Sequence, residues 1–389
     1  PVFNMTDGNY VGKVTLELFS DESADIYYTT DYTYPSPTNG MLYTEPIVFE
    51  DEELRIRAVA YKDGKRSNYV TKDICSVTLG TDDMFTINDD GVITAYTGNV
   101  KYLKIPEIIK GIKVTDIANS SGFSTAEIYG VILPDTLEYL GATYDYYQRN
   151  ISTNEQIGPF NGNESIQFII GENIKMIGRL GAADNPNLNY VHFPNCEYIM
   201  YRGFKDSGIL GAEFPKVETV GKEAFTGALY LREIYLPLCE KIGSNAFGND
   251  SSLSVVYMPN VNYLDFKEAA PTEIVFTPDN TEATQKLFTN NNELVSVDLP
   301  KMQTIGTDAF YKTPVKRLEL SQVQYIYNLP NTLQQDHIGT EFYNTYYSKY
   351  YLPVSVELSL PSTLQYCISA TDYKNEFIEY VVYGTADKR

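Results

Sequence analysis

LREIYLPLCEKIGSNAF occupies residues 231–247, and LVSVDLPKMQTIGTDAF occupies residues 294–310. Each segment alternates apolar and polar residues up to a Pro and reaches a Phe ten positions after that Pro. The Pro and Phe pairs are Pro194/Phe204, Pro215/Phe225, Pro237/Phe247, Pro278/Phe288 and Pro300/Phe310, and Pro259 continues the series of prolines at steps of 19 to 22 residues. Self-similarity at such a period indicates a solenoid, in which each coil buries its apolar face against its neighbours.

Positions counted from the Pro of each repeat predict the inside and the outside of a coil. Positions −3 and −1 are apolar and flank a polar residue, as in a short strand with one buried face. The Pro ends that strand because it has no backbone N–H to donate to the ladder. Position +2 is apolar, a Gly after Val220, Ile242 and Ile305 permits a tight bend, and the Phe at +10 is expected to fill the coil interior.

The same pattern extends beyond its clearest repeats. It includes Leu103, Ile105 and Pro106, then Val131, Leu133 and Pro134, then Phe168 and Ile170 before Gly171, and finally Ile378, Val381 and Tyr383 before Gly384. We therefore expect a solenoid of roughly ten coils over residues 79–389, about 50 Å long at the spacing of adjacent strands. Residues 79–117 would form its N-terminal cap, with Asp90-Gly91 as the turn of a hairpin.

Residues 1–78 lack this period and consist of short strand-like segments separated by turns. The segments are VTLELFS (14–20), ADIYYTTD (24–31), EPIVF (45–49) and LRIRAVAYKDGKRS (54–67). Alternation in the last segment fits a half-buried strand, and Lys62-Asp63-Gly64 fits a turn. Such segments predict a small β-sandwich. The expected fold class is therefore mainly β, with an immunoglobulin-like sandwich at 1–78 followed by the solenoid at 79–389.

These segments carry two family resemblances. The repeat pattern resembles the leucine-rich repeats of the BspA-like, Treponema-type class, which implies a bacterial cell-surface or secreted protein with a role in adhesion and protein binding and no catalytic residues. The segments IYYTTD, LYTEPIVF and IRAVAYKDGKRS resemble the chitobiase/β-hexosaminidase C-terminal-like module. That resemblance implies an immunoglobulin-like or fibronectin-III-like fold in a spacer or accessory role. Tyr32 stands where that module usually has Gly, so this turn is expected to differ.

The charge of the chain excludes several kinds of partner. The formal net charge is −21, and the first 78 residues hold 13 acidic and 7 basic residues, so both parts are acidic. Nucleic acid and anionic membranes require a basic surface, so neither is an expected partner. No run is long enough for a transmembrane helix. The chain begins at Pro1 without a signal peptide, which we interpret as processing or truncation; we expect an extracellular or cell-surface monomer.

The four cysteines give no disulfide framework. Cys196 and Cys239 share position +2 two coils apart, about 10 Å from each other at the strand spacing. A disulfide needs Cα atoms within roughly 7 Å. We therefore expect both to be buried apolar residues, and Cys75 and Cys367, which lie in different parts of the chain, to stay free.

Residues suited to catalysis or metal binding are sparse. Only His192 and His337 occur, and the HxxxH, CxxC, GxSxG and GxxxxGK spacings are absent. We expect no enzymatic activity, no cofactor and no metal. Asp82-Asp83 and Asp89-Asp90 offer paired carboxylates that could in principle serve a glycosidase or bind calcium, but solvated turns are the favoured interpretation. His192, at position −2, is expected to point outward.

Tyrosine supplies the strongest binding signal, because the chain has 34 Tyr and no Trp. Two Tyr-rich stretches interrupt the repeat: one holds Tyr144, Tyr146 and Tyr147, and the other holds Tyr343, Tyr346, Tyr347, Tyr350 and Tyr351. Insertions in a solenoid form loops at the coil edge, and Tyr offers rigid, amphipathic contact area. These residues are the candidate ligand-binding residues; the alternative is that they pack the insertions onto the flank of the solenoid.

Three functional interpretations remain from the sequence. The leading one is a non-enzymatic surface protein that binds an extracellular protein or glycan ligand. The second is an accessory glycan-binding component of a polysaccharide-processing system, and the third is a hydrolase with an unrecognised carboxylate pair.

Overall fold

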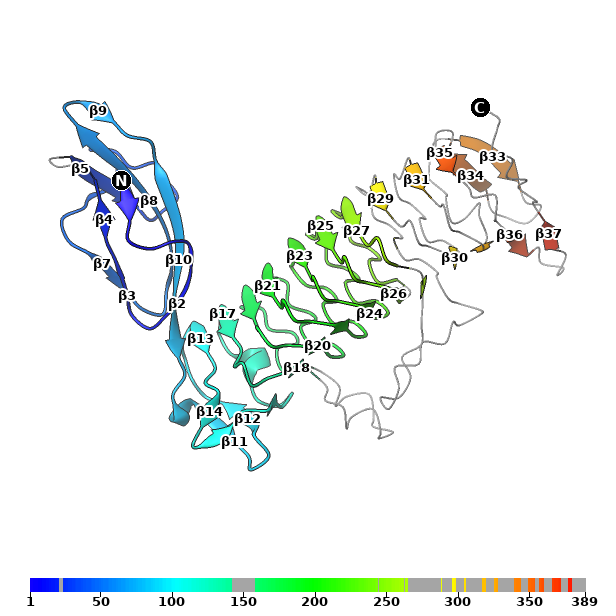
Figure 1. Cartoon of the computed structure of the whole chain (residues 1–389), viewed down its shortest axis with the longest axis horizontal. Coiled ribbons are helices and arrows are strands. Elements are labelled where there is room, and N and C mark those ends of the chain that lie inside the picture. Colours follow the sequence, from blue (N-terminus) through cyan, green and yellow to red (C-terminus); the bar gives the residue numbers. More distant parts are fainter. Residues whose placement is uncertain are drawn as a thin grey trace.

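The computed structural model consists of a β-sheet module joined to a β-solenoid (Figure 1). It describes residues 1–20, 24–141, 158–243 and 245–261, Phe288, and the backbone of the strands β28 to β37 further along the chain. No α-helix occurs among these residues, and none of their helical segments has the length and hydropathy to span a membrane. The predicted class, a β-domain followed by a repeat solenoid, is confirmed.

The module is built from ten strands around one apolar core. They are β1 (Val2–Phe3), β2 (Gly8–Val11), β3 (Val14–Leu16), β4 (Leu18–Phe19), β5 (Asp25–Thr29), β6 (Met41–Leu42), β7 (Ile47–Phe49), β8 (Glu53–Lys62), β9 (Lys65–Arg66) and β10 (Val70–Leu79). β8 pairs antiparallel with both β5 and β10, and β1–β4 and β3–β7 form small separate pairs. Leu16, Ile26, Ile56 and Ile74 are buried in the core, because alternate residues of a strand face the same side.

Strand β10 belongs to both parts of the molecule. Its residues 70–75 pair with β8, whereas Thr78 and Leu79 pair in parallel with β13 (Tyr102–Lys104), the strand of the first coil. A single sheet therefore runs from β6, β5 and β8 through β10 into β13, β17 (Gly130–Ile132), β19 (Phe168–Ile170) and β21 (Tyr190–His192). The expected boundary at residue 78 falls inside this strand.

Asp51 of the module forms a second contact at the junction between the module and the first coil. Its carboxylate accepts hydrogen bonds from the backbone N–H groups of Lys101, at 2.9 Å, and Tyr102, at 2.8 Å. Asp51 itself has a left-handed backbone with φ 52°, and its N–H donates to Ser76 Oγ at 3.1 Å. Charged acceptors make the stronger hydrogen bonds, so this contact fixes the start of the solenoid.

A cap of short elements covers the first coil. It comprises η1 (Asp82–Met84), β11 (Phe85–Ile87), β12 (Val92–Tyr96), β14 (Ile108–Ile109), β15 (Ile112–Lys113), β16 (Asp116–Ile117) and η2 (Phe123–Thr125). β11 and β12 pair antiparallel around the Asp90-Gly91 turn, which confirms the predicted hairpin. Gly91 has φ 82°, and a Cβ there would lie 2.3 Å from Lys113 O, so only Gly fits.

Two ladders of parallel strands run along the solenoid. The first ladder is interrupted after β21, which contacts β23 without pairing with it. It resumes as a sheet of β23 (Gly211–Glu213), β25 (Glu233–Tyr235), β27 (Val255–Tyr257), β29 (Ser296–Asp298), β31 (Arg317–Glu319) and β35 (Glu357–Ser359). The second consists of β18 (Tyr139–Leu140), β20 (Met176–Ile177), β22 (Tyr198–Ile199), β24 (Thr219–Val220), β26 (Lys241–Ile242) and β28 (Tyr263–Leu264). The inward residues Val191, Ala212, Ile234 and Val256 occupy the predicted position −3, and all are buried.

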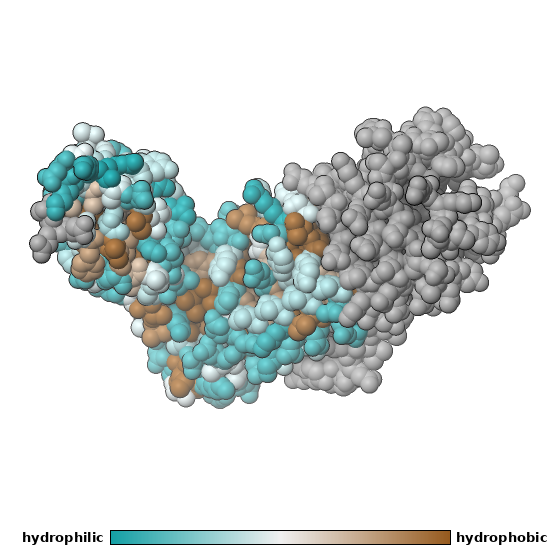
Figure 2. Space-filling model, turned by 45° about the horizontal axis from the view of Figure 1, so that its top comes forward, coloured by the Kyte–Doolittle hydropathy of each residue, from teal (hydrophilic) through white to brown (hydrophobic). Residues whose placement is uncertain are grey.

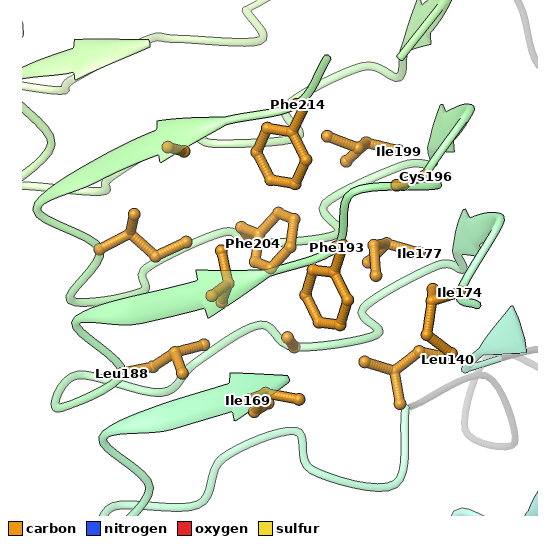
Figure 3. Packing of buried hydrophobic residues seen from close by; sticks show 14 of the residues in the cluster. Leu140, Ile169, Ile174, Ile177, Leu188, Phe193, Cys196, Ile199, Phe204 and Phe214 are labelled. Atoms are coloured by element: carbon orange, nitrogen blue, oxygen red, sulfur yellow. The ribbon is translucent and has the colours of Figure 1, made fainter. Parts of the chain in front are cut away.

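The Phe residues at +10 form a stack through the core, as predicted. Phe204, Phe225 and Phe247 are fully buried. Phe225 stacks on Phe204 with centroids 5.4 Å apart and on Phe247 at 5.5 Å. Figure 3 shows Phe193, Phe204 and Phe214 among the Ile and Leu side chains of adjacent coils. Successive coils thus contribute stacked rings to a continuous core.

The glycines after the second-ladder strands have a different role from the predicted one. Neither Gly221 nor Gly243 has positive φ, but a Cβ on Gly221 would lie 2.6 Å from Met200 C, and one on Gly243 would lie 2.3 Å from Lys222 N. The absence of a side chain therefore permits close approach of successive coils rather than an unusual turn.

One coil departs from the predicted register by a single residue. We expected Phe168 and Ile170 to face inward before Gly171, but Ile169 pairs with Val131 and Val191 and is the buried residue. A Cβ on Gly171 would contact Leu133 and Phe193, so Gly171 itself occupies position −1. A shift by one residue exchanges the two faces of a strand, and Phe168 therefore lies on the outer face.

The count of coils also differs slightly from the prediction. About seven turns, those of β13 to β27, are described with their side chains, and β29, β31 and β35 continue the ladder. β27 pairs directly with β29, and Phe247 stacks directly on Phe288 with centroids 5.7 Å apart. No strand of this ladder therefore lies between β27 and β29, although the spacing of the prolines suggested another coil there; Pro278 itself lies outside the described residues.

The C-terminal strands continue the parallel pattern only in part. They are β30 (Thr304–Ile305), β32 (Tyr325–Tyr327), β33 (Gly339–Tyr343), β34 (Lys349–Pro353), β36 (Tyr366–Thr371) and β37 (Phe377–Glu379). β30 pairs in parallel with β32, and β32 pairs in parallel with β36. β33 and β34 pair antiparallel, and β37 pairs antiparallel with β36. Ile378 therefore lies in an antiparallel strand rather than in a further parallel coil, whereas Val381 and Tyr383 lie outside the described residues.

Candidate ligand-binding surfaces

The Tyr-rich stretches chosen from the sequence lie largely outside the described residues. This holds for Tyr144, Tyr146, Tyr147, Tyr346 and Tyr347. The remaining three belong to β33 and β34, which pair antiparallel with Tyr343 opposite Lys349, Phe342 opposite Tyr350 and Glu341 opposite Tyr351. The backbone thus forms a hairpin within the second stretch, and the assignment of these Tyr to a ligand remains a prediction.

A second surface is the outer face of the first ladder, whose exposed strand positions beside His192 are the predicted alternative if the Tyr-rich stretches have a structural role. Outward residues alternate with buried ones along each strand. Tyr190, Tyr235 and Tyr257 are exposed there by 49, 37 and 40%, respectively. Tyr235 and Tyr257 come from paired strands and lie with ring centroids 6.2 Å apart. We call Tyr190, Tyr235, Val255 and Tyr257 the outer Tyr row.

Carboxylates accompany the outer Tyr row. The Tyr235 hydroxyl donates to Glu233 Oε2 at 3.1 Å, and this hydrogen bond raises the pKa of Tyr235 above its usual value. His192 points outward as predicted, with Nε2 at 3.6 Å from Glu172 Oε1. The surface therefore presents apolar rings, phenol hydroxyls and acceptor oxygens, which are the groups of an interaction surface.

The outer face of the first ladder carries an apolar cluster where the solenoid meets the module. Cys75 and Val77 of β10 pack there with Tyr102 and Phe168 in a cluster separate from the solenoid core. The Tyr102 and Phe168 rings stack with centroids 6.0 Å apart, and a Cβ on Gly130 would overlap the Phe168 ring. Figure 2 shows a hollow between the module and the described part of the solenoid, with hydrophobic residues at its base.

The described residues contain no group of three or more His, Cys, Asp and Glu side chains arranged to hold a metal. The paired carboxylates act in turns: Asp82 Oδ1 accepts from Lys110 N at 2.9 Å, and Asp83 Oδ1 accepts from Thr81 Oγ1 at 2.5 Å. At the other pair, Asp90 N–H donates to Asn88 Oδ1 at 3.1 Å. His337 lies outside the described residues.

The cysteine predictions are confirmed for the residues that the structure describes. Cys75, Cys196 and Cys239 are free and buried. Burial raises the pKa of the Cys196 and Cys239 thiols to about 12. Cys367 lies in β36, and its side chain is outside the described set.

Fold and surface together define a repeat solenoid that carries an N-terminal β-module and exposes an aromatic outer face. Residues 158–270 and 262–330 match the BspA type leucine rich repeat region, in six copies. Residues 14–74 match the family described as Fn3 associated. The chain therefore contains BspA-type leucine-rich repeats, with an Fn3-associated module before them.

The chain is similar to the crystal structure of the pneumococcal vaccine antigen PcpA, with 15% identity and a TM-score of 0.25 over 63% of this chain and 76% of that one. No curated protein shows significant similarity to the chain.

The outer Tyr row could have been found from the repeat itself. Tyr235 and Tyr257 stand at position −2, as His192 does, and Tyr190 stands at position −4. These positions lie on the solvent side of the predicted strand. The recurrence of a large aromatic residue at positions where a charged or small polar residue is expected therefore indicates this surface.

Proposed function

We propose that this chain is a non-enzymatic bacterial cell-surface or secreted protein that mediates adhesion by binding a protein through its repeat solenoid. The observation that carries the proposal is the outer Tyr row. Aromatic residues form a large share of binding hot spots, and a solenoid offers them on an extended surface. Membership of the BspA-type repeat family supports this role and the surface location.

The Tyr-rich stretches around Tyr144 and Tyr346 supply further contact residues in this proposal. The binding part is the solenoid at 79–389, and the module at 1–78 precedes it. Carboxylates engaged in turns, such as Asp82, and unreactive buried cysteines support a binding role over a catalytic one. The solenoid acts as a monomer in this scheme, because one face of one chain supplies the whole surface.

Binding to purified host extracellular-matrix proteins tests the proposal. Biolayer interferometry should detect at least one matrix protein bound by the full chain, and Tyr235→Ser together with Tyr257→Ser should weaken it by at least about tenfold. Tyr230→Ser is the control, since Tyr230 is also an exposed tyrosine, at 58%, but lies outside the ladder strands. Absence of binding across the panel, or equal loss in the control, would refute the proposal.

A further inference from the structure

One stretch of this acidic chain is strongly basic. Residues 54–72 contain Arg55, Arg57, Lys62, Lys65, Arg66 and Lys72 but only one acid, Asp63, whereas the chain as a whole has a net charge of −21. At physiological ionic strength charges act over about 8 Å. A partner at this site therefore experiences the local positive charge rather than the distant negative charge.

The fold gathers part of this charge on one face of the module sheet. Ile56, Ala58 and Ala60 of β8 are buried in the module core, so Arg55 and Arg57 lie on the opposite face. Arg66 of β9 pairs opposite Tyr61 of β8 and lies on that same face.

Three tyrosines interleave with the three guanidinium groups. Arg55 lies over the Tyr32 ring at 5.5 Å from its centroid, Arg57 over Tyr34 at 4.1 Å, and Arg66 over Tyr69 at 4.4 Å. The rings of Tyr34 and Tyr69 meet edge to face with centroids 4.9 Å apart, which joins the pairs into one surface. The residues of this surface, here named the Tyr–Arg face, are Tyr32, Tyr34, Arg55, Arg57, Arg66 and Tyr69.

Two of the guanidinium groups carry uncompensated charge. Arg55 forms a two-point ion pair with Asp73 at 2.5 and 2.7 Å. Arg57 instead donates to the Thr71 hydroxyl at 3.2 Å and to Tyr32 O at 3.0 Å. Within the described ranges, no carboxylate lies within 4.0 Å of Arg57 or Arg66. Neutral hydrogen bonds thus hold the Arg57 guanidinium in place and leave its charge available.

One tyrosine of the Tyr–Arg face, Tyr32, is held at a conformational cost. Tyr32 has a left-handed backbone with φ 67°, which costs a residue other than Gly about 1 kcal/mol. Tyr32 and Tyr34 are nevertheless 69% and 61% exposed, so burial does not offset this cost. Strain retained at exposed aromatic residues is typical of a binding site.

We propose that the Tyr–Arg face binds an anionic polysaccharide, with its carboxylate or sulfate groups on Arg57 and Arg66. Guanidinium groups match both anions with planar donors. The C–H faces of pyranose rings pack on the electron-rich faces of exposed tyrosines. An acidic peptide would use the charges but not the three ring faces, and the acidity of the remaining chain disfavours long nucleic acids. This site is separate from the outer Tyr row of the solenoid.

Calorimetric titration of the full chain tests the proposal with defined probes. These are a sulfated heparin-derived oligosaccharide, a carboxylated oligogalacturonate, and neutral dextran of similar length. At least one anionic probe should bind, and dextran should not. Arg57→Gln with Arg66→Gln should weaken binding at least about tenfold and reduce its salt dependence, whereas the control Lys13→Gln, outside the face, should change it less than about twofold. The probe that binds identifies the anion.

Two single variants and a second binding measurement separate a loss of binding from a loss of folding. Arg66→Gln and Tyr34→Ser alter exposed side chains, so each should weaken binding even if loss of the Arg57 hydrogen bonds perturbs folding. Matrix-protein binding through the outer Tyr row should be unchanged in these variants. The proposal is overturned if neither anionic oligosaccharide binds, if binding survives all of these substitutions, or if oligoglutamate or single-stranded DNA of equal charge binds as tightly as the glycan.

Discussion

Phe225 stacks on Phe247 with ring centroids 5.5 Å apart and ring planes 12° apart, although the two residues belong to successive coils. Both rings are fully buried. Because the contact repeats with Phe204 on one side and Phe288 on the other, loss of one ring leaves a cavity that neighbouring coils cannot close without losing their own register.

Phe225→Ala should lower the free energy of unfolding by about 3–5 kcal/mol, as truncation of buried Phe does. Urea denaturation followed by circular dichroism measures the change. Leu238→Ala serves as control, because Leu238 is exposed in the following coil, and should have a small effect. A midpoint for Phe225→Ala equal to that of the wild type would contradict the assignment of the core.

Cys196 and Cys239 should react slowly with thiol reagents in the folded protein. Their side chains are fully buried, and burial raises the pKa of each thiol to about 12, so little thiolate is present at neutral pH. Timed alkylation followed by peptide mapping measures each site, with the denatured chain as control. Rapid native labelling of either thiol, or a disulfide between them, would show that the prediction is wrong.

Asp116→Asn should stabilise the protein at neutral pH but not at acidic pH. Burial raises the pKa of Asp116 from 3.8 to about 6, so the folded state holds this proton more tightly than the unfolded state. The associated stabilisation is present below pH about 4 and is lost as pH rises through about 6. Asn cannot ionise and can still accept the hydrogen bond from Ile117 N–H.

The gain for Asp116→Asn at pH 7 should be roughly 1–3 kcal/mol, reduced by partial exposure of the side chain. Thermal unfolding at pH 4, 5, 6 and 7 measures it, with Asp89→Asn in an exposed turn as control. A difference from wild type that does not grow as pH rises would rule out this titration.

Asp51→Ala should loosen the contact between module and solenoid. The carboxylate accepts from Lys101 and Tyr102 N–H, and hydrogen bonds to charged groups contribute about 1.5–3 kcal/mol. Hydrogen exchange at these two amides should accelerate markedly, whereas the neighbouring control Glu50→Ala should not alter it. Unchanged protection in Asp51→Ala would show that strand pairing alone maintains the junction.

Replacing Tyr346, Tyr347 and Tyr350 with Ser should weaken ligand binding by several kcal/mol in total if these residues anchor a partner, with thermal stability nearly unchanged. Comparing this loss of binding with that of the Tyr235→Ser and Tyr257→Ser double variant shows which surface contributes more to ligand binding. A loss of folding without a separate loss of binding would mean that the three Tyr have a structural role.

Much of the solenoid follows from its period, because a buried position recurs in every repeat and each occurrence supports the others. The register failed at Gly171, where a Gly in an inward position carries no hydrophobic signal. The predicted number of coils was also too high, because β27 pairs directly with β29 although the spacing of the prolines suggested another coil between them. Periodicity reports on residues that face the core and gives little information about irregular segments.

The candidate surfaces were harder to predict for a related reason. Arg57, Tyr34 and Tyr69 come together only through strand pairing and a loop, and pairing partners are not visible in a strand pattern. The total charge of the first module also concealed its basic segment. A running charge along residues 54–72 would have revealed that segment but not the tyrosines beside it.

Because β10 supplies the neighbour of β13, the first ladder of the solenoid has no free edge at its N-terminal end. An unpaired parallel strand is a template on which another chain can add. A chain beginning after Leu79 would present β13 in that state and should associate end to end, whereas the intact chain should not. The module thus protects the protein from polymerising, whatever else it binds.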